Sequence, residues 1–242
     1  MKVFQQTRQQ RGARYFTWRP VALFIVGVVA LGAAVSPAAV DARTVADAVA
    51  IYGADARARL KAKFASAGAE YPPSEITLLA MKQESILELW TETATTRPRF
   101  IASYQIRALS GSAGPKLREG DRQVPEGFYE IVGLNPNSRY HLSMKLNYPN
   151  AFDLKHARLE GRDQPGSNIF LHGKAVSIGC LAMGDDNIEE LFVAAADIGR
   201  ANINVIVSPL DPRAHAMPTI QEPSWVARLY ARLSQAFARY QR

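Results

Sequence analysis

The stretch His172-Gly173-Lys174-Ala175-Val176-Ser177-Ile178-Gly179-Cys180 contains the only cysteine of a 242-residue chain, eight residues after a histidine. Along one continuous strand these two side chains would lie about 26 Å apart. Residues 168–172 and 176–180 are short apolar runs, and Gly173-Lys174-Ala175 separates them. This pattern predicts a turn that folds the second run back beside the first. Cys180 can then approach His172, which a straight strand forbids.

A thiol needs a base or an ion-pair partner to react near neutral pH, and histidine is the usual one. We therefore expect Cys180 to be a nucleophile and His172 its general base and acid. Gly179 lets the backbone approach a substrate carbonyl closely, so the amides around Cys180 could donate to an oxyanion. Gly173, Ser177 and Ile178 are expected to contact the substrate, and Ser177 is a better candidate for supporting the turn than for attack.

The composition restricts the other kinds of chemistry. A single cysteine excludes an internal disulfide framework and any cysteine-rich zinc or iron–sulfur site. No pair of histidines has the spacing of metal ligands, so we expect no metal and no cofactor. The alternative interpretation of a lone cysteine is a small buried apolar residue, and that of the histidine is a hydrogen-bonded strand residue. With 48% hydrophobic and 21% charged residues, the chain has the composition of a globular protein.

The formal charge of +7 is concentrated at the N-terminus. Residues 1–38 hold five of the 29 basic residues and none of the 22 acidic ones, so without them the chain is nearly neutral. A basic segment, the 15-residue apolar run 21–35 and the small residues around Ala38 predict an export signal. The run would be about 22 Å long as a helix, too short to span a bilayer core, although an uncleaved anchor remains an alternative. We expect a periplasmic or cell-envelope protein that does not bind nucleic acid.

The rest of the chain predicts a mixed α+β fold that is mainly β. A helix is expected at 44–67, a hairpin at 76–91, strands at 100–106, 128–132, 140–146 and 203–207, a helix from Asp185 or Asp186 to Gly199, and an amphipathic helix at 224–240. Glu189, three residues after Asp186, suggests a capping box. The expected segments are a signal or anchor (1–38), a helical lead-in (39–73), the main domain (74–210) and a C-terminal amphipathic tail (211–242).

The segment around Cys180 resembles the catalytic motif of the L,D-transpeptidases, the YkuD-type domain. That motif has His-Gly followed by Ser-x-Gly-Cys, here His172-Gly173 and 177–180. Pro125-Glu126-Gly127-Phe128-Tyr129-Glu130-Ile131 is similar to the family's strand entry, and the segments 114–121 and 134–150 look more like its YafK-like branch. The resemblance covers about residues 74–208. Two features depart from most of the superfamily: the short gap between His172 and Cys180, and Ala182 in place of arginine.

The resemblance implies a β-sandwich or curved mixed sheet with one inserted helix and flanking terminal helices. It also implies a cysteine nucleophile, a histidine base and a main-chain carbonyl that orients the imidazole. The implied substrates are peptidoglycan stem peptides, attacked at an L-to-D linkage through an acyl-enzyme on Cys180. An enzyme of this kind could act as a transferase, which forms a new bond from the acyl-enzyme to an amine. It could also act as a peptidase, which hydrolyses the acyl-enzyme and so could release a wall-attached lipoprotein. The alternative functions are a non-catalytic peptidoglycan-binding protein and a membrane-anchored envelope assembly protein. We expect the protein to be a monomer, and to be bound to a membrane only if the signal is uncleaved.

Overall fold

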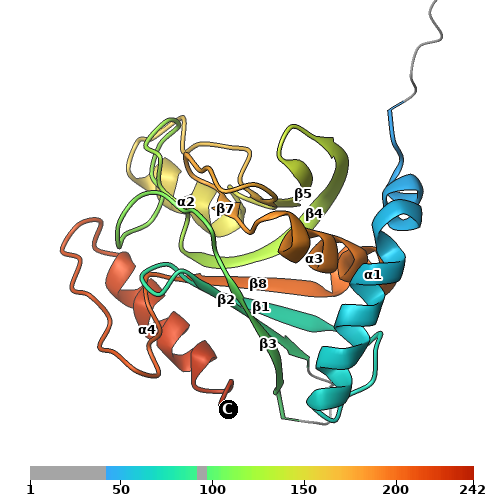
Figure 1. The fold of residues 1–242 in the computed structure, drawn as a ribbon. Helices are drawn as coiled ribbons and strands as arrows, with labels where there is room; N and C mark the ends of the chain where they lie inside the picture. The colour runs from blue at the N-terminus through green and yellow to red at the C-terminus, as the bar shows by residue number, and fades with distance from the viewer. Residues whose placement is uncertain (1–41, 92–96) are drawn as a thin grey trace, which may run out of the picture. The chain divides into compact units, whose positions relative to one another are not determined.

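A mixed sheet of eight strands is the central feature of the part of the chain that the structure describes (Figure 1). The structure is a computed structural model, and it describes residues 42–91 and 97–242. The predicted export signal at residues 1–38 lies outside the described residues. The strand order is β3-β2-β1-β8-β4-β5-β6-β7, in which β1 and β8, and also β6 and β7, run parallel.

In chain order the strands are β1 (Ile76–Met81), β2 (Ile86–Thr91), β3 (Arg99–Gln105), β4 (Gly127–Ser138), β5 (His141–Leu146), β6 (Phe170–His172), β7 (Leu181–Ala182) and β8 (Ile203–Ser208). The helices are α1 (Val45–Ser66), α2 (Ala151–Leu159), α3 (Asp185–Ile198) and α4 (Val226–Phe237), with a 3-10 turn η1 (Arg200–Asn202) before β8. The predicted hairpin at 76–91 and the strands that follow it are confirmed.

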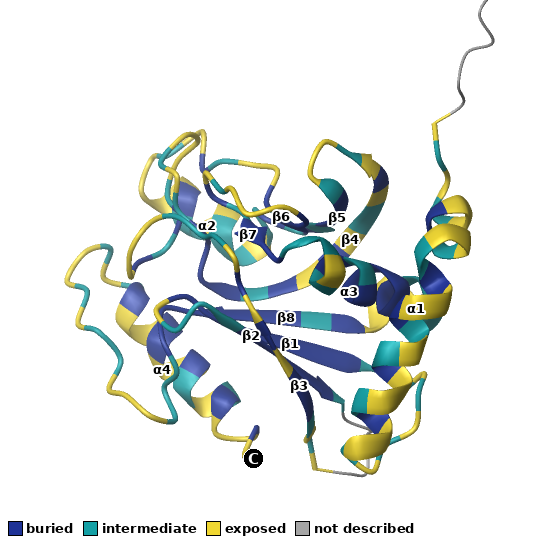
Figure 2. Cartoon of the chain, in the orientation of Figure 1, coloured by how far each residue is buried: buried dark blue, intermediate teal, exposed yellow. Residues whose placement is uncertain are grey.

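Strand β1 is buried on both faces, and this explains its unbroken apolar sequence. All six residues of β1 are buried. Leu78 and Ala80 belong to the larger core with α3, whereas Leu79 and Met81 belong to a second core with α4. A strand covered on both sides has a continuous apolar run rather than an alternating one. Figure 2 shows β1 and its neighbours as the most completely buried part of the sheet. The predicted mixed, mainly β fold with flanking helices is confirmed.

Strand β4 joins the two halves of the sheet. Its residues 127–130 pair with β8, and its residues from Ile131 onward pair with β5. The register shifts between Ile131 and Gly133, and such a bulge bends a strand. The strands β5, β6 and β7 therefore lie apart from the β1–β3 half of the sheet (Figure 1). This second half carries the segment that contains His172 and Cys180.

Helix α1 is fastened to α3 and β3 through one buried carboxylate. Glu190 is 3% exposed, and it accepts hydrogen bonds from Arg59 Nε at 2.7 Å, from Lys63 Nζ and from the Tyr104 hydroxyl at 2.9 Å. A buried charge requires such partners, so Glu190 fixes where α1 lies on α3.

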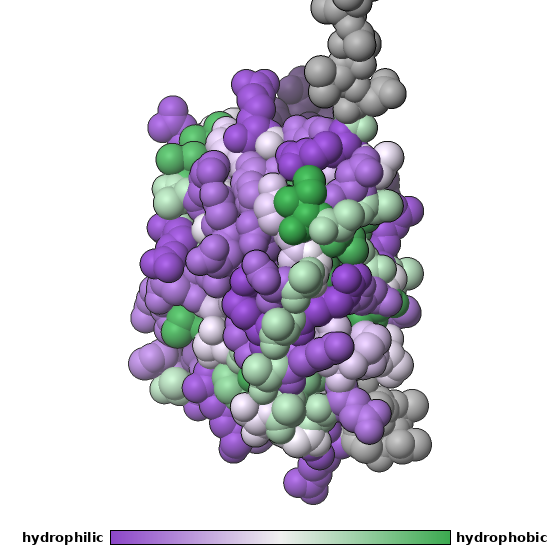
Figure 3. Space-filling view, turned by 45° about the vertical axis from the view of Figure 1, so that its right-hand side comes forward, coloured by the Kyte–Doolittle hydropathy of each residue, from purple (hydrophilic) through white to green (hydrophobic). Residues whose placement is uncertain are grey.

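The molecular face shown in Figure 3 is mostly hydrophilic, with hydrophobic residues in small groups.

Helix α4 covers the opposite face of the sheet. Its buried residues Val226, Leu229, Tyr230, Leu233 and Phe237 pack in the second core. The amphipathic pattern at 224–240 therefore reflects docking on the domain, which is the more common role of such a stripe. Among residues 42–91 and 97–242, no helix combines the length and the apolar character needed to cross a bilayer.

The predicted hairpin around Gly173-Lys174 is wrong. Residues 173–180 form an irregular loop, and β7 begins only at Leu181. The strand after the loop runs parallel to β6 rather than antiparallel. Val176 and Ile178, which suggested a buried strand, are 58% and 77% exposed. The apolar run therefore reflects a loop with an apolar surface.

Two helix predictions also need correction. The N-cap of α3 is Gly184, which makes no side-chain cap, so the capping box of Asp186 and Glu189 does not form. Helix α2 was not predicted, although Asn150 and Asp153 form a true capping box at its start. Only one residue of α2 is buried, so the helix has almost no apolar periodicity to reveal it.

Candidate active site

The parallel pairing of β6 and β7 brings the two ends of the loop 173–180 together. His172 is the last residue of β6, and Cys180 immediately precedes β7. Leu171 pairs with Leu181 and His172 with Ala182, so Cys180 lies beside Phe170, two residues before His172. The predicted hairpin is absent, and it is the loop with the parallel return of β7 that places the backbone of Cys180 beside β6.

The ring of His172 is held by a main-chain carbonyl. Its Nδ1 lies 2.6 Å from the oxygen of Gly173. A carbonyl only accepts hydrogen bonds, so Nδ1 carries the proton, and in the neutral ring the lone pair is on Nε2. The ring also packs on that of Tyr140, with 4.6 Å between centroids. Burial lowers the pKa of His172 below its usual 6.5, and the bond to Gly173 opposes this only in part. The imidazole is therefore a neutral base near pH 7.

Cys180 is partly buried, and its thiol faces main-chain oxygens. The Sγ atom donates a long hydrogen bond of 3.8 Å to the carbonyl of Asn168. Burial raises the pKa of the Cys180 thiol above its usual 9, whereas the backbone of Phe170 and the positive charge of Lys116 act in the opposite direction. The resting thiol is therefore protonated near neutral pH, and it needs a base to become a nucleophile.

Ser177 organises the backbone that precedes the thiol. Its Oγ accepts hydrogen bonds from the amides of Gly179 at 3.2 Å and Cys180 at 3.1 Å, and it donates one to the carbonyl of Cys180 at 2.6 Å. Gly179 has a φ of +133°, a conformation that residues with a side chain rarely adopt. The predicted turn-supporting role of Ser177 agrees with these bonds. In the resting loop the two amides that could hold an oxyanion are directed at Ser177.

Gly173 is required for close packing behind the loop. A Cβ atom on this residue would lie 2.6 Å from the carbonyl oxygen of Tyr140 and 2.6 Å from Oδ1 of Asp185. That carboxylate accepts a hydrogen bond from the amide of Lys174 at 2.8 Å and pairs with its Nζ at 2.5 Å. Asp185, at the predicted start of the helix, therefore ties the first turn of α3 to the loop.

The loop between β3 and β4 forms the wall beside Gly179. The carbonyl oxygen of Gln123 would lie 3.6 Å from a Cβ on Gly179. A buried ion pair holds this loop, in which Lys82 Nζ lies 2.8 Å from Oε1 of Glu126 and also donates to three main-chain carbonyls. On the far side of the loop 173–180, a cavity of about 420 Å³ is lined by Lys174, Met183 and neighbouring residues.

The structure therefore brings His172, Gly173, Ser177, Gly179 and Cys180 into one small region. Ile178, which was expected to contact the substrate, is on the exposed rim of the loop. Three residues that touch this region come from outside the predicted motif: Tyr140, Asn168 and Gln123. No spacing within the motif could have revealed them.

The chain is similar to known proteins over this same region. Residues 86–204 match the YkuD family, described as the L,D-transpeptidase catalytic domain. The chain is also 34% identical over 141 residues to the "Putative L,D-transpeptidase YafK" of Escherichia coli (strain K12). This alignment covers 56% of the chain and 54% of the relative, so the chain spans about half the length of the curated relatives it matches.

Solved structures with a similar arrangement include the helical cell shape determining protein Pgp2 of Campylobacter jejuni, as its K307A mutant. The comparison gives a TM-score of 0.46 and 22% identity, and it covers 70% of this chain and 56% of the other. L,D-transpeptidase 1 of Mycobacterium tuberculosis gives a TM-score of 0.31 and 13% identity over 55% of this chain and 62% of the other. Residues 86–204 of this chain are therefore similar to the YkuD family of L,D-transpeptidase catalytic domains, and the identity to YafK supports the same similarity.

Proposed function

We propose that this protein is an exported cysteine enzyme that acts on peptidoglycan stem peptides at an L-to-D linkage. The observation that carries the proposal is the arrangement of His172, whose Nδ1–H is bound by the Gly173 carbonyl while Cys180 immediately precedes the strand β7 that pairs with β6. This leaves Nε2 as the basic atom of a neutral ring. The similarity of residues 86–204 to the L,D-transpeptidase catalytic domain suggests the class of substrate.

In the proposed first step, Nε2 of His172 removes the proton of the Cys180 thiol. The sulfur forms a bond to the carbonyl carbon of the L-residue in the stem peptide, and the C–N bond to the following residue breaks. The imidazolium then returns the proton to the leaving amine nitrogen. Because burial keeps both groups neutral at rest, the base is needed at the moment of attack and not before it.

In the second step, the thioester is attacked by an amine or by water. His172 takes a proton from the incoming group, and the sulfur leaves as the thiol of Cys180. Attack by an amine gives transfer, and attack by water gives hydrolysis, which includes the release of a wall-attached lipoprotein. The location is the periplasm or cell envelope, and the segments 39–73 and 211–242 flank the catalytic part at 74–210.

The negative charge that develops on the carbonyl oxygen needs donors. The amides of Gly179 and Cys180 are our proposed donors, and both are bonded to Ser177 Oγ in the resting loop. We propose that substrate binding shifts these two amides. They then donate hydrogen bonds to the oxyanion, either together with Ser177 Oγ or in place of it. Ile178 is exposed beside them and could contact the apolar part of the stem peptide.

The test uses purified protein, a carbapenem and lipoprotein-linked sacculi. Carbapenem is expected to add its mass to the wild-type chain and not to Cys180→Ala, while His172→Gln should react at least a hundredfold more slowly. Sacculi should yield either tetrapeptide ends and freed lipoprotein or new cross-links, identified by mass spectrometry. A matched control is His156→Gln, because His156 stacks on Trp225, away from the loop. Full activity of Cys180→Ala would contradict the proposal, and binding to sacculi without turnover would favour a wall-binding protein.

A further inference from the structure

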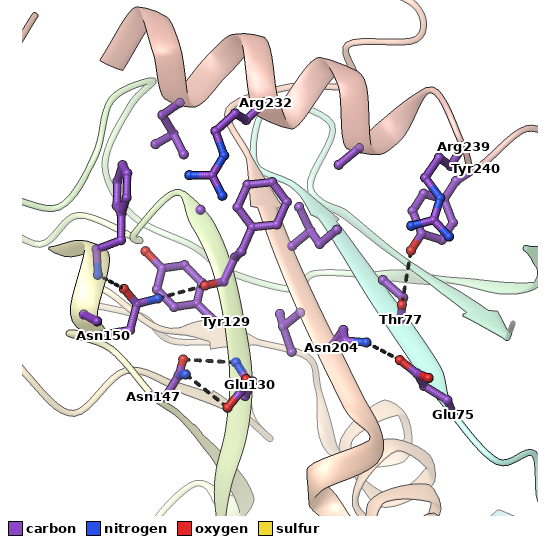
Figure 4. A pocket seen from close by; sticks show the side chains of 18 residues that line it. Glu75, Thr77, Tyr129, Glu130, Asn147, Asn150, Asn204, Arg232, Arg239 and Tyr240 are labelled. Atoms are coloured by element: carbon purple, nitrogen blue, oxygen red, sulfur yellow. Dashed lines mark hydrogen bonds between the residues drawn. The ribbon is translucent and has the colours of Figure 1, made fainter. Parts of the chain in front are cut away.

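One cavity of the molecule lies away from Cys180. It has a volume of about 690 Å³ and is enclosed by the inner side of α4, the strands β1, β8 and β4, and the start of α2 (Figure 4). None of the residues that line it belongs to the segment 168–183. Its size is that of a pocket for a small molecule or a short peptide. The proposed chemistry at Cys180 leaves this cavity without a role.

One wall of the cavity carries a cation that no acid neutralises. Arg232 of α4 points into the cavity (Figure 4). Its guanidinium lies over the rings of Phe128 at 5.0 Å and Phe152 at 5.7 Å. Within the described part of the chain it pairs with no carboxylate. Aromatic faces on the guanidinium leave its planar edge free, and this edge matches a carboxylate in a bidentate pair. Arg239 enters the same cavity two helical turns later.

The opposite side of the cavity carries two carboxylates, one from Glu75 just before β1 and one from Glu130 in β4. Oε1 of Glu75 accepts a hydrogen bond from Asn204 Nδ2 at 2.5 Å. Glu130 is bound through its amide to the side-chain oxygen of Asn147 at 3.0 Å. Neither carboxylate is in an ion pair with a residue that the structure describes. These side chains lie across the cavity from the arginine residues in Figure 4. The cavity thus holds charges of both signs that do not neutralise each other.

This separation of charge selects one class of ligand. A polyanion such as nucleic acid or a polyphosphate would be repelled by Glu75 and Glu130. A neutral sugar would leave Arg232 and both carboxylates unpaired, which costs free energy where water is displaced. A ligand with a carboxylate at one end and an ammonium group at the other pairs with both walls. The carboxamides of Asn147 and Asn204 offer hydrogen bonds to the peptide groups in between.

We propose that this cavity is a second, non-catalytic site that binds a zwitterionic peptide, with the peptide carboxylate on Arg232 and its ammonium group on Glu75 and Glu130. The choice of peptide rests on the proposed function: a stem peptide with a diamino acid carries both groups. A bound stem peptide would hold the protein on the wall while Cys180 acts on another stem.

The experiment titrates the full chain carrying Cys180→Ala, which prevents turnover, with a stem tetrapeptide that has a free carboxylate and a free side-chain ammonium group. Backbone amide shifts in NMR spectra separate the two locations, because Glu130 and Asn204 report on the cavity and Ser177 on the loop. We expect both locations to shift. Adding Arg232→Gln should weaken binding at the cavity at least tenfold. The matched control is Arg228→Gln, an exposed residue of α4 that does not line the cavity, and it should change neither location.

Two further ligands test the assignment of charges. The C-terminal amide lacks that carboxylate, and the peptide acetylated on its side-chain amine lacks that ammonium group; each should bind the cavity at least tenfold more weakly than the free peptide. Equal binding of all three, or shifts at the loop alone, would overturn the second site. Shifts at the cavity without shifts at the loop would support the second site and count against the proposed function. The experiment can therefore refute the second site without refuting the proposed function, and the proposed function without refuting the second site.

Discussion

His172 and Cys180 are both uncharged near neutral pH, and burial is the main reason in each case. Burial lowers the pKa of the imidazole below 6.5 and raises the pKa of the thiol above 9. A thiolate–imidazolium pair would require the opposite shifts. Both groups are therefore uncharged at rest, and under the proposed function the proton moves only when the sulfur attacks a substrate carbonyl.

The pH dependence of Cys180 follows from these directions. Alkylation by iodoacetamide, which requires thiolate, should still rise as the pH passes 9. Acylation by a carbapenem should fall in acid, at a lower pH than an ordinary histidine would give because the pKa of His172 is lowered, since protonated His172 cannot accept the thiol proton. Stopped-flow rates between pH 5 and 10 measure both, with glutathione as the control thiol. A rate of alkylation that is already constant at pH 7 would show an ion pair instead.

Ser177→Ala is expected to slow acylation of Cys180 about tenfold or more. The change removes the oxygen that binds the amides of Gly179 and Cys180 and the proton that binds the Cys180 carbonyl, so the backbone before the thiol loses its fixed direction. Thermal stability should fall by only about 1 kcal/mol, since the loop is partly exposed. Ser103→Ala, at an exposed hydroxyl of β3, is the matched control. An unchanged acylation rate would mean that the loop holds its shape without Ser177.

At this scale the sequence was informative about the motif and silent about its surroundings. The residue types and order of His172, Ser177 and Cys180 were sufficient to predict which chemistry to expect. The positions of Tyr140 and Asn168 depend on how β5 and β6 pair, and no local pattern encodes that pairing. The hydrogen bonds of the Gly179 amide depend on a positive φ, which the glycine permits but does not require.

At the scale of elements, the junction of β6, α3 and the loop depends on the absence of a side chain at Gly173. Gly173→Ala would place a methyl group 2.6 Å from the Tyr140 carbonyl and from Asp185, so either β5 or α3 must move. We expect a loss of stability of about 1–3 kcal/mol and at least a tenfold loss of acylation. Denaturant unfolding and carbapenem mass shifts measure these two effects.

The matched control is Gly133→Ala in β4. A Cβ there would meet only Lys145 Cβ at 3.6 Å, which is an ordinary contact. Its stability should stay within about 1 kcal/mol of wild type. If Gly173→Ala behaved like this control, the loop would be much more adaptable than its packing indicates.

The wall formed by residues 110–126 depends on the ion pair of Lys82 and Glu126. Lys82 is 4% exposed, and its Nζ donates to the carbonyls of Ser112, Gly114 and Val124 as well as to Glu126. Lys82→Met leaves a buried carboxylate without its cation, which costs about 3–5 kcal/mol. Calorimetric melting should show this loss together with slower acylation, because the loop lies against Gly179.

The double variant Lys82→Met with Glu126→Gln tests the cause of that loss. Since it removes the uncompensated charge, we expect it to recover a large part of the stability. The exposed Lys155→Met should change stability by less than about 0.5 kcal/mol. A single variant as stable as wild type would show that the loop does not depend on this pair.

Elements with a buried face were predictable, and those without one were not. The apolar periodicity of β1, β2 and α4 comes from real cores, so the pattern predicts them well. Helix α2 buries one residue and was missed. In the loop 173–180, a strand was predicted where none exists. Val176 and Ile178 are apolar but exposed, so their sequence has the pattern of a buried strand.

For the whole molecule, the two cores on opposite faces of the sheet have different tasks. The larger core fixes β5 and β6, and with them the loop that holds Cys180. The second core joins α4 to β1, β2 and β8, and it shapes the cavity that contains Arg232. The cavity could not be predicted from the sequence, because its residues come from five helices and strands and the segments beside them, between Glu75 and Tyr240. A substitution in the second core should therefore alter the cavity and leave the loop 173–180 unaffected.

Phe237→Ala tests whether α4 is an integral part of the fold. The Phe237 ring is fully buried in the second core, with the guanidinium of Arg213 at 5.4 Å from its centre. Removing the ring should cost about 3–5 kcal/mol, visible as a lower midpoint in denaturant, while the exposed Gln235→Ala should stay within about 0.5 kcal/mol of wild type. If α4 were instead a surface anchor, Phe237→Ala would leave the unfolding midpoint unchanged and weaken binding to anionic vesicles. Because five residues of α4 are buried against the sheet, we expect Phe237→Ala to lose stability. We expect neither the wild type nor Phe237→Ala to bind vesicles.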